Sequence, residues 1–173
     1  MEVVDNTLGI IQIGEDEKSR IRNPSQSMAF LFVSSSKQVT GFLLAEHISA
    51  KSDNITKTLV IPKKSKEPLD KNFEPVMYEL DEKTQNKVCA GISRIWVRSD
   101  YQRKGIGSRM VDAMRTHFLG HYHFLSPEQF AFSHTTPNGT DFAMKYMTKK
   151  FSKKAFLTYA PALVAKETTK KAI

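Results

Sequence analysis

The feature that most constrains the fold is a strand pattern followed at once by a glycine loop and a helix pattern. Residues 88–97 place apolar side chains on both faces of an extended chain, which indicates a central strand covered on both sides. The loop Gln102-Arg-Lys-Gly-Ile-Gly107 follows it. A helix over 105–119 is predicted by apolar residues that recur every four positions, namely Ile106, Met110, Met114 and Phe118. This order indicates an α/β fold.

The loop has the features of a diphosphate site. Its two glycines let the backbone approach a ligand closely and adopt left-handed conformations. The first N–H groups of a helix lack intrahelical partners and carry the positive end of the dipole, which favours a bound anion. Arg103 and Lys104 add two cations. The loop lacks the later glycine of a dinucleotide fingerprint and the Gly-Lys-Ser/Thr of a nucleotide P-loop. An ordinary strand–helix turn with solvated basic residues is the alternative.

The rest of the chain predicts further elements of a mixed α/β domain. Strands are expected at 28–33 and 39–45 (a hairpin), 57–61, 130–133 and 155–159. A turn is expected at 137–139 and a short helix at 141–149. Residues 1–24 are expected to form an early strand or turn, and the proline-rich, charged segment 62–75 a mobile loop. We predict one domain over 1–161 and a basic tail over 162–173.

Charge and hydropathy narrow the class of protein. The 173 residues carry a net charge of +8, which favours acidic partners. Eight lysines crowd the end of the chain: Lys145, Lys149, Lys150, Lys153, Lys154, Lys166, Lys170 and Lys171. A solvated helix face and a loose tail explain them as well, because no nucleic-acid motif accompanies them. Neither a signal peptide nor an apolar run of about 18 residues is present, so an intracellular protein with no membrane partner is expected.

Cysteine and histidine give little support for a covalent or metal-dependent mechanism. The one cysteine, Cys89, excludes an internal disulfide and lies in an apolar strand pattern, which favours a small buried side chain over a nucleophile. His121 and His123 have no cysteine or acidic partner at ligand spacing, so they are interpreted as surface histidines. No metal is expected in this chain.

Gln102-x-x-Gly-x-Gly107 resembles the coenzyme A–binding motif of the general-control-type N-acetyltransferase superfamily, Arg/Gln-x-x-Gly-x-Gly/Ala. The resemblance implies that fold: a mixed, mostly antiparallel sheet splayed at its centre, with helices on both faces. It implies acetyl-CoA as the cosubstrate. By the same resemblance, the pantetheine arm pairs with Ile95, Trp96 and Val97. The diphosphate lies on Arg103, Lys104, Gly105, Ile106, Gly107 and Ser108.

A narrower resemblance covers about 41–159. Cys89-Ala-Gly-Ile-Ser-Arg-Ile-Trp-Val97 is similar to the Cys-Gly-Ile-Ser-Arg-Ile-Trp-Val segment of the cohesin acetyltransferases. The likeness extends to Leu44-Ala-Glu-His-Ile48, Ser108-Arg-Met110, Ala131-Phe-Ser133, Thr136-Pro-Asn-Gly139 and Phe142-Ala143. It implies transfer of acetyl to lysines of an SMC-type cohesin subunit, establishing sister-chromatid cohesion. Nuclear, chromatin-associated localisation and cohesin-associated and replication proteins as partners are implied too.

The same resemblance implies site residues. Ser93 and Asp112 match positions implicated in catalysis, and Arg109 matches an arginine beside them. Four further positions match cofactor contacts: Thr136, Pro137, Asn138 and Phe142. Animal relatives carry an acid linked to catalysis where this chain has His134. The zinc finger that often precedes the domain cannot be built from one cysteine, so this chain is either the catalytic part alone or a divergent member.

The residues themselves leave alternatives open. A lysine amine must lose a proton before it attacks a thioester, so the site needs a base. Asp112 is the first candidate, although helical spacing also fits a surface ion pair with Arg109. His134 has a suitable ordinary pKa but equally fits an exposed loop position, and Trp96 alone fits a core residue.

Two other functions compete with protein-lysine acetylation. One is an acetyltransferase of the same fold that acts on a small amine or a protein N-terminus. The other is a non-catalytic module that binds coenzyme A or chromatin partners.

Overall fold

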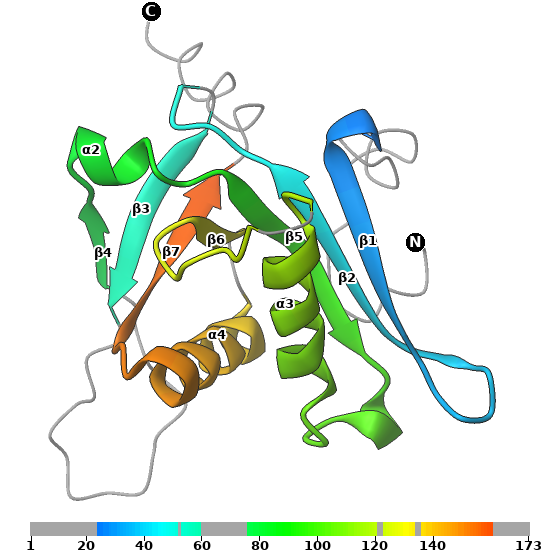
Figure 1. Ribbon diagram of the computed structural model, residues 1–173. Coiled ribbons are helices and arrows are strands. Elements are labelled where there is room, and N and C mark those ends of the chain that lie inside the picture. Colours follow the sequence, from blue (N-terminus) through cyan, green and yellow to red (C-terminus); the bar gives the residue numbers. More distant parts are fainter. Residues whose placement is uncertain (1–23, 52, 60–75, 121–122, 134–135, 161–173) are drawn as a thin grey trace, which may run out of the picture. The chain divides into compact units, whose positions relative to one another are not determined.

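The computed structural model describes residues 24–51, 53–59, 76–120, 123–133 and 136–160 (Figure 1). The chain divides into two compact units, one from residues up to His47 with Ile92–Leu125, the other from Ile48–Gly91 with the residues after Leu125. Strand β5 (Ala90–Val97) crosses the boundary between them. The predicted early strand or turn at 1–24 (except Pro24), the mobile loop and the basic tail lie outside the described residues.

The first unit is built on a hairpin and one long helix. A 3-10 turn at Pro24–Gln26 (η1) precedes β1 (Ser27–Val33), which pairs antiparallel with β2 (Val39–His47). The strand order in this unit is β1-β2-β5. The hairpin is therefore confirmed, with β2 two residues longer than predicted. After β5 come η2 (Ser99–Tyr101) and α3 (Ile106–His117), within the helix range that the apolar periodicity predicts.

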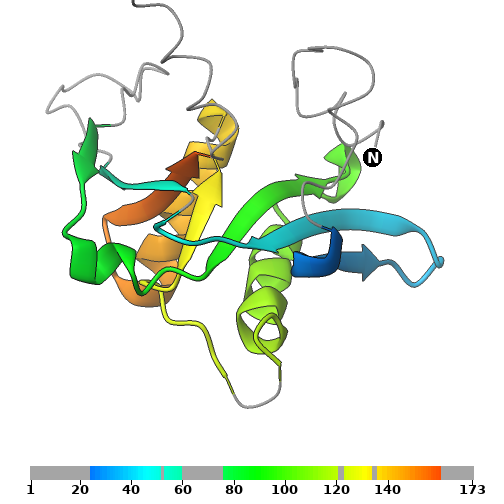
Figure 2. The same ribbon diagram turned by 90° about the horizontal axis from the view of Figure 1, so that it is seen from above.

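Helix α3 packs against the hairpin through its apolar stripe. Ile106, Met110, Met114 and Phe118 are all buried, as the four-residue spacing predicts. The approach is close at Gly41, where an added Cβ would lie 2.9 Å from Ile106 Cγ2 and 3.1 Å from Met110 Cε. Figure 2 shows α3 lying along one side of the β1–β2 pair. This packing fixes where the amino end of α3 stands relative to the hairpin.

The second unit is a four-stranded arrangement with the order β6-β7-β3-β4. Its elements are β3 (Asn54–Leu59), β4 (Val76–Glu79), α2 (Glu82–Gln85), β6 (Phe130–Ser133), α4 (Pro137–Phe151) and β7 (Ala155–Ala160). β6 and β7 are parallel and joined through α4, which packs on β7 (Figure 1), while β3 pairs antiparallel with both neighbours. The mixed, mostly antiparallel α/β class is confirmed. The central splay and helices on both faces stay predictions.

The core of the second unit contains two sets of contacts. One cluster holds Ile48, Ile55, Val88, Ala131, Leu157 and Tyr159. The other is a run of aromatic rings around Phe132, whose centroid lies 5.6 Å from Phe156 and 6.5 Å from Phe142. Gly91 on β5 lies against the first cluster, because an added Cβ would meet the Tyr159 ring at 2.7 Å and Ile48 Cγ2 at 2.8 Å.

Gly91→Ala should destabilise the second unit. The Tyr159 ring is 1% exposed and cannot move aside easily, so the new methyl group forces a shift in a packed core. Overpacking of this kind costs about 1–3 kcal/mol. Urea unfolding followed by circular dichroism should show a lower midpoint with an unchanged slope. A midpoint equal to that of the wild type would contradict the packing described for Gly91.

Two predicted boundaries are wrong or shifted. The predicted turn at 137–139 is the first turn of α4, so the helix expected at 141–149 starts at Pro137 and ends at Phe151. The reason is capping: Thr136 Oγ1 accepts a hydrogen bond from the Gly139 amide at 3.2 Å, and proline is well suited to the first helical position. β3 starts at Asn54, three residues before the predicted strand, and residues 60–61 lie outside the described part.

Candidate functional site

The turn between β5 and α3 leaves helix amides without partners from the helix. Gly105 is the N-cap of α3 in the left-handed conformation (φ 78°), and no side chain caps the helix. The first helical hydrogen bond runs from the Arg109 amide to the Gly105 carbonyl at 3.1 Å. The amides of Ile106, Gly107 and Ser108 precede that bond, so they have no carbonyl four residues back within the helix. The predicted glycine conformation and the predicted open helix start are both present.

Positive charge surrounds this helix start. Arg103 and Lys104 are exposed, and the Lys104 Nζ lies 4.9 Å from the centre of the Tyr101 ring. No acidic residue occupies the first turn of α3. Helix amides, the dipole and two cations act in the same direction, so the arrangement fits an anion such as a diphosphate.

Arg98, at the end of β5, holds the turn in place. Its Nε and Nη2 donate to the two carboxylate oxygens of Asp100 at 2.7 and 2.8 Å, and its Nη1 donates to Gln38 Oε1 at 2.9 Å. Its guanidinium also lies 4.6 Å from the centre of the Tyr101 ring. The hydrogen bonds lower the pKa of the Asp100 carboxyl and raise that of Arg98. Sequence reasoning did not select Arg98, although an arginine at a strand end two residues before an aspartate was a usable signal.

The end of β5 provides a surface for a ligand chain. Ile95, Trp96 and Val97 are half-buried there, in contrast to the fully buried Ala90 and Ile92 at its start. The Trp96 Nε1 atom is buried and has no hydrogen-bond partner among the described residues. Leaving a buried donor unpaired costs about 1–3 kcal/mol. Because this nitrogen is shielded from solvent, it is not itself a contact for a ligand. The half-buried Ile95, Trp96 and Val97 can border a ligand chain that lies along the end of β5, as the pantetheine arm of coenzyme A would, so the residues present fit the cofactor.

The catalytic candidates of the first unit lie on β5 and α3. Ser93 is half-buried on β5, and Asp112 is half-buried on α3. Arg109 is exposed, and its guanidinium lies 4.8 Å from the centre of the Phe32 ring. Asp112 forms an ion pair with Arg115, so the alternative of a surface ion pair between Asp112 and Arg109 is not what the described residues show.

Arg115 is a buried arginine that the sequence analysis missed. It is 5% exposed, and its Nε donates to the Leu125 carbonyl at 2.8 Å. Its guanidinium lies 4.2 Å from the Phe124 ring centre, and its Nη1 lies 3.7 Å from Asp112 Oδ1. These contacts hold a fixed cation beside the candidate acid. Its position one turn after buried Val111 was the available signal.

The remaining cofactor candidates form the amino end of α4 in the second unit. Thr136, Pro137 and Asn138 are exposed, and Phe142 is half-buried against Phe132. Thr136 has a structural role as the N-cap of α4. The structure thus brings these four positions together on one helix end. His134 lies outside the described residues, and its proposed role stays a prediction.

Thr136→Ala should destabilise α4 through loss of its cap. The Gly139 amide loses its hydrogen bond to Thr136 Oγ1, which should lower the free energy of unfolding by about 0.5–2 kcal/mol. Thr136→Ser keeps the hydroxyl and should behave as the wild type in urea unfolding. If the alanine variant is as stable as the serine variant, Thr136 does not stabilise the helix as the geometry indicates.

The surroundings of Cys89 do not activate its thiol as a nucleophile. Cys89 is half-buried rather than fully buried, its Sγ lies 3.6 Å from the Gln129 carbonyl, and burial raises the pKa of its thiol. A raised pKa disfavours the reactive thiolate.

In the described ranges no three His, Cys, Asp or Glu residues gather as a metal site would require. No helix there is both long and apolar enough to cross a bilayer.

Comparison with known proteins agrees with these features. The family model for the ESCO1/2 acetyl-transferase matches residues 86–159, which include β5, α3, α4 and most of β7. The N-acetyltransferase ESCO1 of Homo sapiens is 35% identical over 145 residues, covering 84% of this chain. The chain corresponds to 16% of the length of that relative.

Solved structures are similar over most of the chain. The xEco2 acetyltransferase domain has a TM-score of 0.62 and 34% identity, covering 92% of this chain and 78% of that one. A second structure of that domain, bound to a K105-CoA conjugate, has a TM-score of 0.61, 34% identity and coverages of 92% and 80%. The similarity therefore spans both units.

Proposed function

Since the chain belongs to the ESCO1/2 acetyltransferase family, we propose that it transfers acetyl from acetyl-CoA to lysines of an SMC-type cohesin subunit. The observation that carries the proposal is the open start of α3, where Gly105 leaves the first amides uncapped beside Arg103 and Lys104. Coenzyme A contains a diphosphate of matching charge. The CoA conjugate bound by the xEco2 domain supports the same ligand.

The cofactor would be held by three groups of residues. Ile95, Trp96 and Val97 would line the pantetheine arm at the half-buried end of β5. The diphosphate would lie on Arg103, Lys104, Gly105, Ile106, Gly107 and Ser108. The amino end of α4 would supply the remaining contacts from Thr136, Pro137, Asn138 and Phe142. When bound, acetyl-CoA supplies the thioester carbonyl that the amine attacks.

The chain's own task is to prepare the amine. A lysine amine has an ordinary pKa of about 10.4, so it is almost wholly protonated at neutral pH. Asp112 would accept its proton or orient it, and the buried Arg115 would keep that carboxylate in one place. Ser93 would orient the amine from β5. His134 would share the proton acceptance, in the position where animal relatives carry an acid.

Family membership also supports a cellular role. We propose that the chain acts in the nucleus, on chromatin, in the establishment of sister-chromatid cohesion. Cohesin would be its substrate, with cohesin-associated and replication proteins as further partners. Fluorescence microscopy of a tagged chain through the cell cycle tests this placement, and a signal absent from chromatin throughout S phase would contradict it.

A substrate panel tests the activity. Purified chain is incubated with acetyl-CoA and three acceptors: a lysine peptide from a cohesin SMC head, a peptide with only a free N-terminus, and a polyamine. Acetylation of the lysine side chain, located by mass spectrometry, is expected for the first acceptor alone. Turnover only on the other two would favour the small-amine or N-terminal activity. Coenzyme A binding without any transfer would favour a non-catalytic module.

A further inference from the structure

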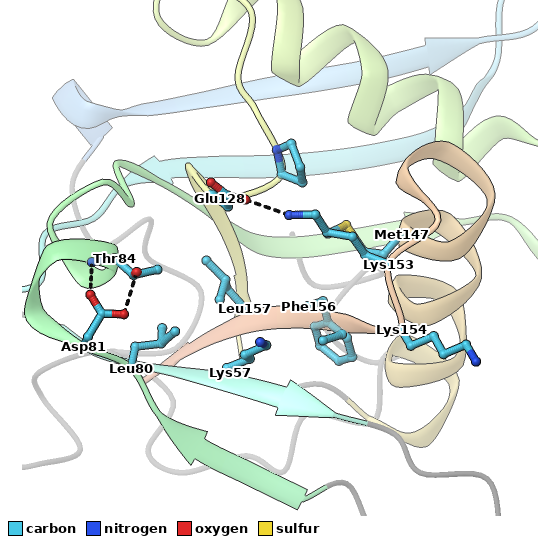
Figure 3. A pocket seen from close by; sticks show the side chains of 12 residues that line it. Lys57, Leu80, Asp81, Thr84, Glu128, Met147, Lys153, Lys154, Phe156 and Leu157 are labelled. Atoms are coloured by element: carbon cyan, nitrogen blue, oxygen red, sulfur yellow. Dashed lines mark hydrogen bonds and ion pairs between the residues drawn. The ribbon is translucent and has the colours of Figure 1, made fainter.

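A second concave site lies within the second unit, at the other end of α4 from the cofactor candidates. It has a volume of about 560 Å³ and lies between α2, the start of β7 and the carboxyl end of α4 (Figure 3). Thr136 and Met147 are eleven positions apart, and at about 1.5 Å per residue α4 separates Thr136 from this cavity-lining methionine by about 16 Å. The volume falls within the range of about 300–1,000 Å³ that is usual for ligand pockets.

The floor of this cavity is apolar and firmly held. Phe156, Met147 and Leu157 are 1%, 2% and 7% exposed, and Leu80 is half-buried beside them. Phe156 packs edge-on to Phe132, and Leu157 belongs to the buried cluster around Tyr159. An apolar floor that the core holds in place can receive one large apolar side chain without rearrangement.

The charged residues around the floor leave an excess of positive charge. Of the lining acids, Asp81 accepts hydrogen bonds from the Thr84 amide and hydroxyl at 2.9 and 2.7 Å, and Glu128 pairs with Lys153 at 2.7 Å. Both contacts lower the pKa of the carboxyl concerned, so both acids are ionised and engaged at neutral pH. Lys57 and Lys154 line the same cavity and form no ion pair with any described residue.

The two lysines lie apart on the rim. Figure 3 shows Lys57 on the side opposite the Lys153–Glu128 pair, and Lys154, in the connection between α4 and β7, with its side chain directed outward. A lysine side chain on an exposed rim can turn its ammonium group toward a bound anion. The cavity therefore combines an apolar floor with two cations available for acidic groups on either side of it.

We propose that this cavity binds an acidic peptide segment of a partner protein, with one large apolar side chain in the floor and flanking carboxylates at Lys57 and Lys154. The carboxylates of the peptide would form ion pairs with Lys57 and Lys154, and its apolar side chain would fill the space over Phe156 and Leu157. Such a site would anchor the enzyme to its partner at the opposite end of α4 from Thr136. It does not depend on acetyl transfer.

Fluorescence anisotropy with a labelled Asp-Glu-Phe-Glu-Asp peptide tests the proposal. Lys57→Glu/Lys154→Glu should weaken binding at least about fivefold. The matched control is Lys51→Glu/Lys149→Glu, which makes the same change in charge at two exposed lysines outside the cavity and should stay within about twofold of the wild type. Affinity should fall as salt rises, and coenzyme A affinity should be equal for all three proteins.

Three results would overturn the proposal. Equal losses in the cavity variant and the control would show that net charge alone attracts the peptide. If an Asp-Glu-Ser-Glu-Asp peptide bound as tightly as the phenylalanine peptide, the apolar floor would not contribute to binding. Light scattering that shows a dimer, lost in the Lys57→Glu/Lys154→Glu variant, would assign the cavity to a second copy of the chain.

Discussion

Gly105→Asp should weaken coenzyme A binding roughly 100-fold while the fold survives. The new carboxylate would stand at the uncapped start of α3, where the diphosphate is proposed to lie. At about 5 Å and an effective dielectric of about 20, one repulsive charge pair costs about 3 kcal/mol, which weakens binding roughly 100-fold. The side chain would also cap the helix amides that the ligand needs. Isothermal titration calorimetry with coenzyme A measures the loss.

Gly120→Asp is the matched control for this variant. Gly120 also has a positive φ, 86°, and an added Cβ at either glycine meets nothing within 4 Å. Both variants therefore carry a similar cost for a positive φ at a non-glycine residue, and neither adds a steric clash. Only Gly105→Asp places a negative charge at the amino end of α3. If both bind coenzyme A as the wild type does, the cofactor assignment fails. If both lose binding together with stability, backbone strain explains the effect, and the electrostatic argument fails.

Asp112→Asn should lower kcat about 100- to 10,000-fold, the usual contribution of a positioned base, with coenzyme A affinity unchanged. Asparagine keeps the shape and an acceptor oxygen for Arg115, so the buried guanidinium retains a partner. Steady-state kinetics on the lysine peptide, with calorimetry for the cofactor, separates the two quantities. Glu82→Gln, an exposed acid of α2, should leave both unchanged.

His134→Ala tests whether His134 shares the proton-accepting role with Asp112. A fall in kcat similar to that of Asp112→Asn, with a changed pH–rate profile, would show that the histidine has taken over part of the acid's role. Wild-type turnover in both variants would remove the catalytic assignment and leave the cofactor site standing.

The elements that the sequence predicted well are those with a strong local signal. The hairpin, β6 and β7 follow from short apolar runs and α3 from four-residue spacing, and the ends of each lie within two residues of the prediction. β4 and α2 were missed: each has four residues, as β6 has, but neither contains a Phe-Ala-Phe run like that of β6 to mark it in the sequence. Pro137-Asn-Gly139 fits a turn by composition, and only the preceding Thr136 cap identifies a helix start.

The candidate site was predictable where it depends on the backbone and less so where it depends on packing. A glycine at a helix start after a strand predicts the left-handed Gly105 and its uncapped amides. Helical spacing cannot choose between Arg109 and Arg115 as partners of Asp112, since both are three positions away. Arg115 is held beside Asp112 by contacts from a segment beyond the helix: its Nε donates to the Leu125 carbonyl, and its guanidinium lies against the Phe124 ring.

Arg98 ties the turn between β5 and α3 to a loop of the same unit that is distant in the sequence. Its amide donates to the Thr40 carbonyl at 3.0 Å and its side chain reaches Gln38, while its other nitrogens grip Asp100. The stretch from 34 to 38 is therefore not a free connection between two strands. Lengthening or shortening this stretch would move Gln38, which holds the Arg98 guanidinium sixty residues later, and the uncapped amides at the start of α3 would shift with it.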